Sequence, residues 1–226
     1  MKIHELLEAK AKSASEEITL KELVRRFSPQ FLGRSGHQLM YRGIKSMPES
    51  AGNFEANGNL YPFYIFDVRK DRKPRDTNSE LSAIIDDWFE EEFAFSARSQ
   101  SAFCTGNRTF ALTFGLESVA VFPVGKFSYI WTPNSQDLID EFQDNKNIKQ
   151  QFYVSDKNGK RVISTDAVHS YLKSLKFTNN NLPAAIKSGN EIMVDCDKYI
   201  AIKVGKVGSH GRITPEQLKA ELDIIE

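Results

Sequence analysis

Apolar residues recur at helical spacing in several separated stretches of the chain. In residues 79–93 they lie three or four positions apart, as on one face of a helix. Residues 19–27 show the same spacing, and the run from Thr19 to Glu22 is a capping box, so we expect a helix that ends before Pro29. The same signals predict further helices over residues 2–12, 135–142, 165–175, 182–186 and 214–218.

Other stretches are rich in β-branched and aromatic residues, which is typical of strands. They cover residues 38–44, 60–68, 98–107, 119–124, 127–131 and two runs within 188–204 that flank a short acidic turn. We interpret residues 119–124 and 127–131 as a strand pair joined near Gly125. Residues 48–58, rich in Gly and Asn, and the basic run 69–77 are both expected to be loops.

The order of these elements defines the expected fold class. Helices and strands alternate irregularly, and several connections between strands are too short for a parallel crossover. We therefore expect an α+β fold with a mostly antiparallel, split sheet and flanking helices. With 226 residues, the chain is long enough for a single α+β domain, placed at residues 31–226, after an N-terminal helical extension at residues 1–30.

Charge and composition narrow the classes of function. The 30 Lys and Arg residues balance 30 Asp and Glu residues, so any binding to nucleic acid or to a membrane surface must be local. Cys104 and Cys196 lie in apolar, strand-like contexts, which predicts buried free thiols in a reducing compartment. Neither a membrane-spanning run nor the apolar core of a signal peptide is present. We expect a soluble, cytoplasmic protein with no membrane partner.

Sequence motifs of several common enzyme classes are absent. The chain has no Walker A motif, no glycine-rich Rossmann turn after a strand, no zincin motif and no nucleophile elbow. The corresponding nucleotide triphosphatase, dehydrogenase, metalloprotease and α/β-hydrolase functions are therefore excluded. The 4 histidines are scattered without a partner at ligand spacing, so we predict no metal site.

Three segments place candidate binding and catalytic residues on or beside predicted strands. The first strand carries Arg42 followed by Gly43, and the second segment carries Ser99 and Ser101 ahead of a Gly-Asn turn. The third strand begins at Glu191, directly after a Ser-Gly-Asn turn. A carboxylate at the start of a hydrophobic strand is held by rigid backbone at a sheet edge, where it can face a ligand.

The order and spacing of these segments, over residues 38–205, resemble the ADP-ribosyltransferase fold. In that fold a first strand carries Arg or His before Gly, a middle strand carries Ser or an aromatic residue, and a last strand carries Glu. The resemblance implies a mono-ADP-ribosyltransferase-like enzyme, with NAD as its substrate. Such an enzyme cleaves the bond between nicotinamide and ribose and transfers ADP-ribose to a protein or nucleic-acid acceptor.

The resemblance also implies a role for each residue. Glu191 would stabilise the positive charge that develops on the ribose and bond a ribose hydroxyl. Arg42 would bind the dinucleotide phosphates, and Gly43 would let the nicotinamide amide approach the backbone. Ser99 or Ser101 would hold the ribose or support the carboxylate.

Two departures from the family pattern leave the acceptor open. The middle segment reads Ser-Gln-Ser instead of Ser-Thr-Ser, and Gly189 stands where transferases that modify arginine or asparagine carry Glu or Gln. An arginine-directed activity is therefore disfavoured. One alternative is a noncatalytic accessory protein, because the start Met1–Leu7 resembles that of small phage-encoded proteins of the host cytoplasm. Another is a nucleic-acid-binding protein that uses the basic residues of 69–75.

Overall fold

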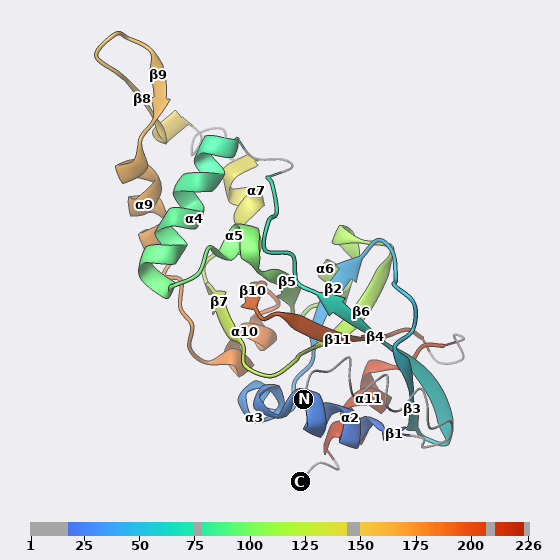
Figure 1. Cartoon of the computed structure of the whole chain (residues 1–226). Coiled ribbons are helices and arrows are strands. Elements are labelled where there is room, and N and C mark those ends of the chain that lie inside the picture. Colours follow the sequence, from blue (N-terminus) through green and yellow to red (C-terminus); the bar gives the residue numbers. More distant parts are fainter. Residues whose placement is uncertain (1–17, 75–77, 144–149, 207–210, 224–226) are drawn as a thin grey trace.

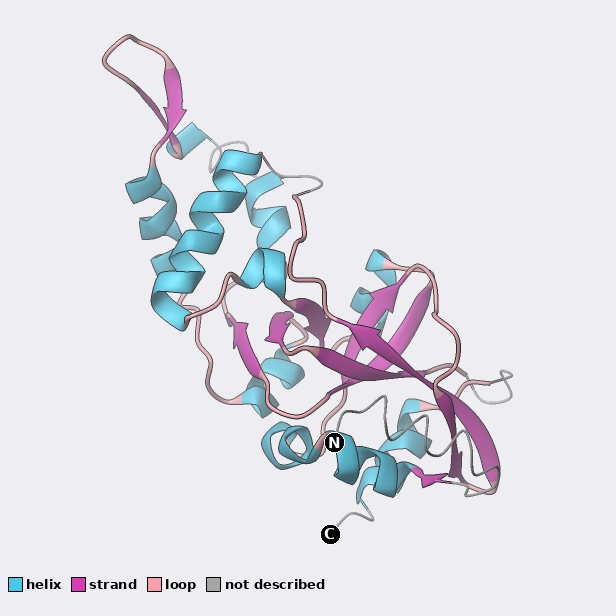
Figure 2. Cartoon of the chain, in the orientation of Figure 1, coloured by secondary structure: helices cyan, strands magenta, loops and turns pink. Residues whose placement is uncertain are grey.

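A nine-stranded sheet forms the centre of the computed structural model, which describes residues 18–74, 78–143, 150–206 and 211–223 (Figure 1; Figure 2). In spatial order its strands are β1 (Ile18–Thr19), β3 (Gly52–Ala56), β4 (Asn59–Asp67), β11 (Lys198–Lys203), β6 (Glu117–Pro123), β2 (Met40–Ile44), β5 (Ala102–Thr105), β10 (Glu191–Asp195) and β7 (Ser128–Trp131). Every described pair except β1–β3 is antiparallel. A mostly antiparallel α+β fold is therefore confirmed.

Helices cover both faces of the sheet. One group packs in the larger apolar cluster: α2 (Leu20–Phe27), α3 (Pro29–Ser35), α6 (Arg108–Ala111), α10 (Leu182–Ser188) and α11 (Pro215–Asp223). A second group packs in the smaller cluster: α4 (Ser79–Phe93), α5 (Ala97–Gln100), α7 (Leu138–Gln143) and α9 (Thr165–Ser174). The 3₁₀ turn η1 (Leu112–Phe114) follows α6, and a hairpin of β8 (Tyr153–Ser155) and β9 (Arg161–Ile163) projects beyond α9 (Figure 1).

Strand β10 lies between the two apolar clusters. Ile192 and Val194 pack in the larger cluster, while Met193 between them packs in the smaller one. This explains the continuous apolar run in its sequence, because a strand buried on both faces needs no polar alternation. Glu191 is thus the first residue of a strand that is fixed from both sides.

Several predicted helix starts are confirmed. The capping box of Thr19 and Glu22 begins α2, and Thr214 and Gln217 exchange equivalent hydrogen bonds at the start of α11. Helix α9 is capped by Ser164, one residue before the predicted cap. Helix α2, within the expected extension 1–30, packs in the larger cluster. The helix predicted for residues 2–12 lies outside the described residues.

The expected loop at residues 48–58 is wrong, because it contains strand β3. Strands β3 and β4 form a hairpin around Asn57 and Gly58, whose φ angles are 51° and 70°. An Asn-Gly pair with both φ angles positive is the preferred centre of a tight hairpin turn. The Asn-Gly dipeptide was therefore a hairpin signal.

The predicted pairing of residues 119–124 with 127–131 is also wrong, although both segments are strands. Strand β6 lies between β11 and β2, whereas β7 pairs with β10 at the edge of the sheet. The Gly125 N–H donates to Phe27 O at the end of α2 (2.8 Å), so the connection packs against a helix.

The strand predicted over residues 98–107 is shorter than expected, because its first part is the helix α5. The Asp86 carboxylate accepts the backbone N–H groups of Arg98 (2.7 Å) and Ser99 (3.3 Å), which satisfies free donors of this short helix. Strand β5 begins only at Ala102. It joins β2 through the single register pair Tyr41–Thr105, so the sheet has a thin junction between these strands.

Candidate functional site

Two adjoining pockets open beside the junction of β2 and β5. The larger has a volume of about 610 Å³ and the smaller about 150 Å³. Both are lined by Arg42, Gly43, Phe103, Phe114 and Ile139. The larger volume falls within the range of roughly 300–1,000 Å³ that is typical of small-molecule sites.

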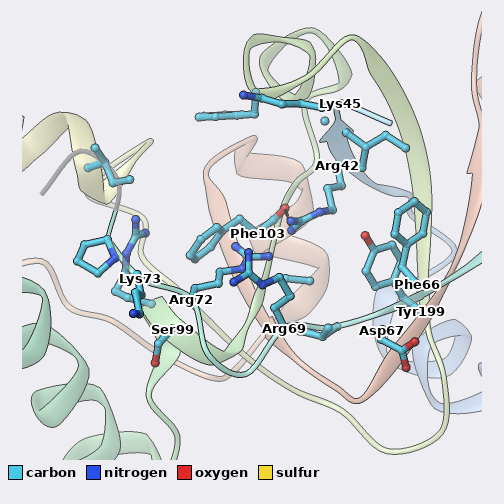
Figure 3. Close-up of a pocket in the computed structure, with 18 of the residues that line it drawn as sticks. Arg42, Lys45, Phe66, Asp67, Arg69, Arg72, Lys73, Ser99, Phe103 and Tyr199 are labelled. Atoms are coloured by element: carbon cyan, nitrogen blue, oxygen red, sulfur yellow. Dashed lines mark hydrogen bonds between the residues drawn. The ribbon is translucent and has the colours of Figure 1, made fainter. Parts of the chain in front are cut away.

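The larger pocket is strongly basic. Among the described residues, its lining includes the cations Arg42, Lys45, Arg69, Arg72, Lys73 and Arg98, but only the carboxylates Asp67 and Asp86 (Figure 3). Asp67 is already paired with Lys198, and Asp86 accepts backbone N–H groups. Within the described residues, Arg42, Lys45, Arg72 and Lys73 form no ion pair with a carboxylate. A pocket of this charge favours an anionic ligand.

Arg72 is a half-buried cation of the pocket. Burial and the neighbouring Arg42 guanidinium lower its pKa to about 10, and Arg69 and Arg98 act in the same direction. Its guanidinium lies 4.9 Å from the centre of the Phe103 ring. Because a bound anion would offset both the burial and the repulsion, the charge around Arg72 favours an anionic group such as a phosphate.

Replacing Arg72 by Gln is expected to raise the free energy of unfolding at neutral pH by about 1 kcal/mol and to remove the stabilisation by inorganic pyrophosphate. A base with a lowered folded-state pKa costs stability while it is protonated, so the gain should fade as the pH rises through about 10. Urea unfolding with and without pyrophosphate measures both effects. Arg161→Gln on β9 is the matched control, and equal stabilisation of both variants by pyrophosphate would contradict the assignment.

Glu191 lines the smaller pocket and is held by several contacts. Arg98 Nη1 donates to both carboxylate oxygens, at 3.2 and 3.0 Å, and only 13% of the Glu191 side chain is exposed. Its backbone N–H donates to Gln136 O at 2.8 Å. Burial raises the pKa of Glu191, Arg98 opposes this rise, and Asp137 adds to it.

Arg98 connects the two pockets. Its side chain lines the larger pocket, stacks at 4.4 Å from the Phe103 ring centre and bonds Glu191 in the smaller pocket. Both bonds to Glu191 come from Arg98 Nη1, which leaves the other nitrogens of the guanidinium for an anion in the larger pocket.

Arg42 and Gly43 line both pockets, and Arg42 shares the smaller one with Glu191. Arg42 Nη1 donates to Phe103 O at 3.0 Å, while its buried Nε has no partner in the described part of the chain. A Cβ atom on Gly43 would lie 2.0 Å from Ala111 O, so the protein's own backbone fills that position. The nicotinamide amide was expected to approach the backbone at Gly43, but on the Cβ side of Gly43 this space is filled by α6.

The two predicted serines are placed differently. Ser99 lines the larger pocket, and its hydroxyl donates to Ser96 O at 3.4 Å. Ser101 is fully buried, donates to Ala97 O at 2.5 Å and lines neither pocket. The structure therefore brings Arg42, Gly43 and Glu191 together, adds Ser99 to the larger pocket and leaves Ser101 apart.

Thr105 and Arg98 are site residues that sequence reasoning missed. Thr105 is the register partner of Glu191 across β5 and β10, and its hydroxyl donates to Gly189 O at 2.6 Å. It therefore fixes the turn that leads into the carboxylate. The sequence signal for Thr105 was its position at the end of β5, directly before Gly106. Arg98 had no such signal, because its position is set by helix α5, a segment that was predicted to be part of a strand.

Two negative findings concern only the described parts of the chain. None of the described helices has the length and apolar character needed to cross a membrane. The same residues contain no cluster of His, Cys, Asp or Glu arranged to hold a metal ion. Both cysteines, Cys104 and Cys196, are buried free thiols, as predicted.

Comparison with known proteins gave no relative. No family model, curated protein or solved structure matches this chain.

Proposed function

We propose that this protein is an ADP-ribosyltransferase-like enzyme that cleaves NAD between nicotinamide and ribose. The observation that carries the proposal is that Arg42-Gly43 and Glu191 line one small pocket. They lie on β2 and β10, which are separated only by β5, the strand that follows residues 99–101.

The larger pocket supports NAD as the substrate. Arg42 and Arg72 form no ion pair with a described carboxylate, and they are suited to bind the diphosphate. The unpartnered Nε of Arg42 is a donor that such a ligand would satisfy. Phe103, Phe66 and Tyr199 line the same pocket and offer apolar surface to the rings of the dinucleotide (Figure 3).

The proposed reaction breaks the bond between the ribose carbon and the nicotinamide nitrogen. The electron pair leaves with nicotinamide, which becomes neutral, while positive charge develops on the ribose. The Glu191 carboxylate stabilises that charge, and the acceptor then donates an electron pair to the same carbon and loses a proton.

Arg98 has a supporting role in this proposal. Its positive charge opposes the rise in the Glu191 pKa that burial causes, and this favours the ionised carboxylate. Each carboxylate oxygen keeps a second lone pair, so Glu191 can bond a ribose hydroxyl while Arg98 remains in place.

Nicotinamide release from NAD tests the proposal. The purified protein is expected to release nicotinamide, and Arg42→Gln is expected to lower kcat/KM by at least about tenfold, because one charged hydrogen bond is worth about 1.5–3 kcal/mol. Arg26→Gln, an exposed change on α2, should keep the wild-type rate. Absence of release from the wild type would overturn the proposal, and NAD binding without release would favour a noncatalytic protein.

A further inference from the structure

The larger pocket carries more positive charge than a dinucleotide diphosphate would neutralise. Arg42 and Arg72 are half-buried, whereas Lys45 and Lys73 are exposed at the rim. Figure 3 shows these lysines on different sides of the cleft, with Arg72 and Phe103 between them. Because the whole chain has a net charge of zero, this concentration of cations is local.

A short segment that reaches the same pocket through Phe114 exposes several apolar side chains. The described residues have five exposed large hydrophobic side chains, and three of them fall in one short segment: Leu112 (40% exposed), Phe114 (49%) and Leu116 (83%). The Phe114 ring packs against Phe110 with its centre 5.0 Å away, and Phe114 lines both pockets. An exposed aromatic ring therefore lines the same pocket as the two exposed lysines.

Exposed cations and an exposed ring around one pocket match the way single-stranded nucleic acid is bound. Lysines contact successive phosphates, and an exposed ring stacks on an unpaired base. We infer that the acceptor of the proposed transferase is single-stranded RNA or DNA, bound across Lys45, Phe114 and Lys73. This inference rests on the proposed function, since it names the acceptor of that reaction.

The transfer needs no reactant other than NAD and the nucleic-acid strand. A nitrogen or hydroxyl oxygen of the strand donates an electron pair to the ribose carbon as nicotinamide leaves with the pair of the broken bond. The nucleophile then loses its proton to Glu191 or to water. The products are ADP-ribosylated nucleic acid, nicotinamide and a proton.

Binding of a fluorescent single strand of about 15 nucleotides, a length near the upper site size of a single binding groove, tests this surface without NAD. The affinity should fall steeply as salt rises from about 50 to 200 mM. In Lys45→Gln/Lys73→Gln the affinity should drop at least about tenfold, and the log–log salt slope should become shallower by about 1.4. Phe114→Ala should weaken binding without changing the slope, because it removes stacking and no charge.

The control is Lys157→Gln/Lys160→Gln, which removes the same charge from the exposed β8–β9 turn. It should bind the strand like the wild type. An acidic peptide of similar length serves as the competing ligand. Tight peptide binding with no binding of the strand would overturn the inference.

Incubation with adenine-labelled NAD separates failure of this inference from failure of the proposed function. Label on the strand, reduced in the rim variant, supports both. Nicotinamide release without binding or labelling of the strand overturns the acceptor and leaves the NAD-cleaving activity in place. Strand binding without any nicotinamide release overturns the enzyme and, with it, the role of the strand as acceptor.

Discussion

Glu191→Gln is expected to lower the rate of nicotinamide release by about 10²–10³-fold, the usual loss when one preorganised charge-stabilising group is removed. Gln keeps the size of the side chain and an oxygen that can accept from Arg98, but it carries no charge to offset that of the ribose. The loss should therefore appear in kcat, with little change in NAD binding. Steady-state assays of released nicotinamide give both quantities.

The same substitution should stabilise the fold at neutral pH. Burial raises the pKa of Glu191, because the folded protein favours the neutral carboxyl group. The stability that this gives is fully present below the pKa of the unfolded state, near 4.5, and is lost as the pH rises through the pKa of the folded state. Gln avoids this loss. The free energy of unfolding of the variant should exceed that of the wild type at neutral pH, and the two should converge at acidic pH.

Asp195→Asn is the matched control, because Asp195 ends the same strand and pairs with Lys70 outside the smaller pocket. It should retain nicotinamide release. Activity of Glu191→Gln within a few-fold of the wild type would remove Glu191 from the proposed chemistry. A stability difference between Glu191→Gln and the wild type that stays the same from acidic to neutral pH would contradict the burial of its charge.

Gly43→Ala is expected to destabilise the protein by about 3 kcal/mol, near the upper end for overpacking a tightly packed site. The added Cβ would lie 2.0 Å from Ala111 O and 3.0 Å from Gly115 N, and both are backbone atoms. The segment from α6 to Gly115 would have to move away from β2. Because Arg42 and Phe114 are carried by these two elements, both pockets should widen and NAD cleavage should fall.

Urea unfolding measures this loss, and Gly33→Ala provides the comparison. Gly33 lies in α3, is exposed and has no atom within 4 Å of an added Cβ. Alanine there should stabilise the protein by about 0.5–1 kcal/mol, because it lowers the entropy cost of the helix. Equal stabilities of the two alanine variants would show that α6 can keep its position against β2 when residue 43 has a side chain.

Local signals in the sequence predicted the individual elements well. Helix α4 follows the predicted residues 79–93, and the capping boxes of α2 and α11 form as expected. The mostly antiparallel sheet followed from the short connections. These features depend on spacing and on side chains a few positions apart, which one sequence displays directly.

Long-range pairing was not accessible in the same way. The separation of β6 from β7 arises because β2, β5 and β10 insert between them, and no local pattern encodes that order. Likewise, Arg98 and Glu191 are 93 positions apart and meet only through α5 and β10. Arg42 and Glu191 were proposed together from a family resemblance, and the smaller pocket contains both.

The burial of β10 on both faces determines how long the carboxylate keeps its place. A strand held between two apolar clusters opens only when both clusters come apart, which is close to unfolding of the whole protein. Lys45, Lys73 and Phe114 are instead carried by short segments outside the sheet. The position of Glu191 should therefore last as long as the fold itself, while the groups at the rim can be exchanged during evolution without disturbing it.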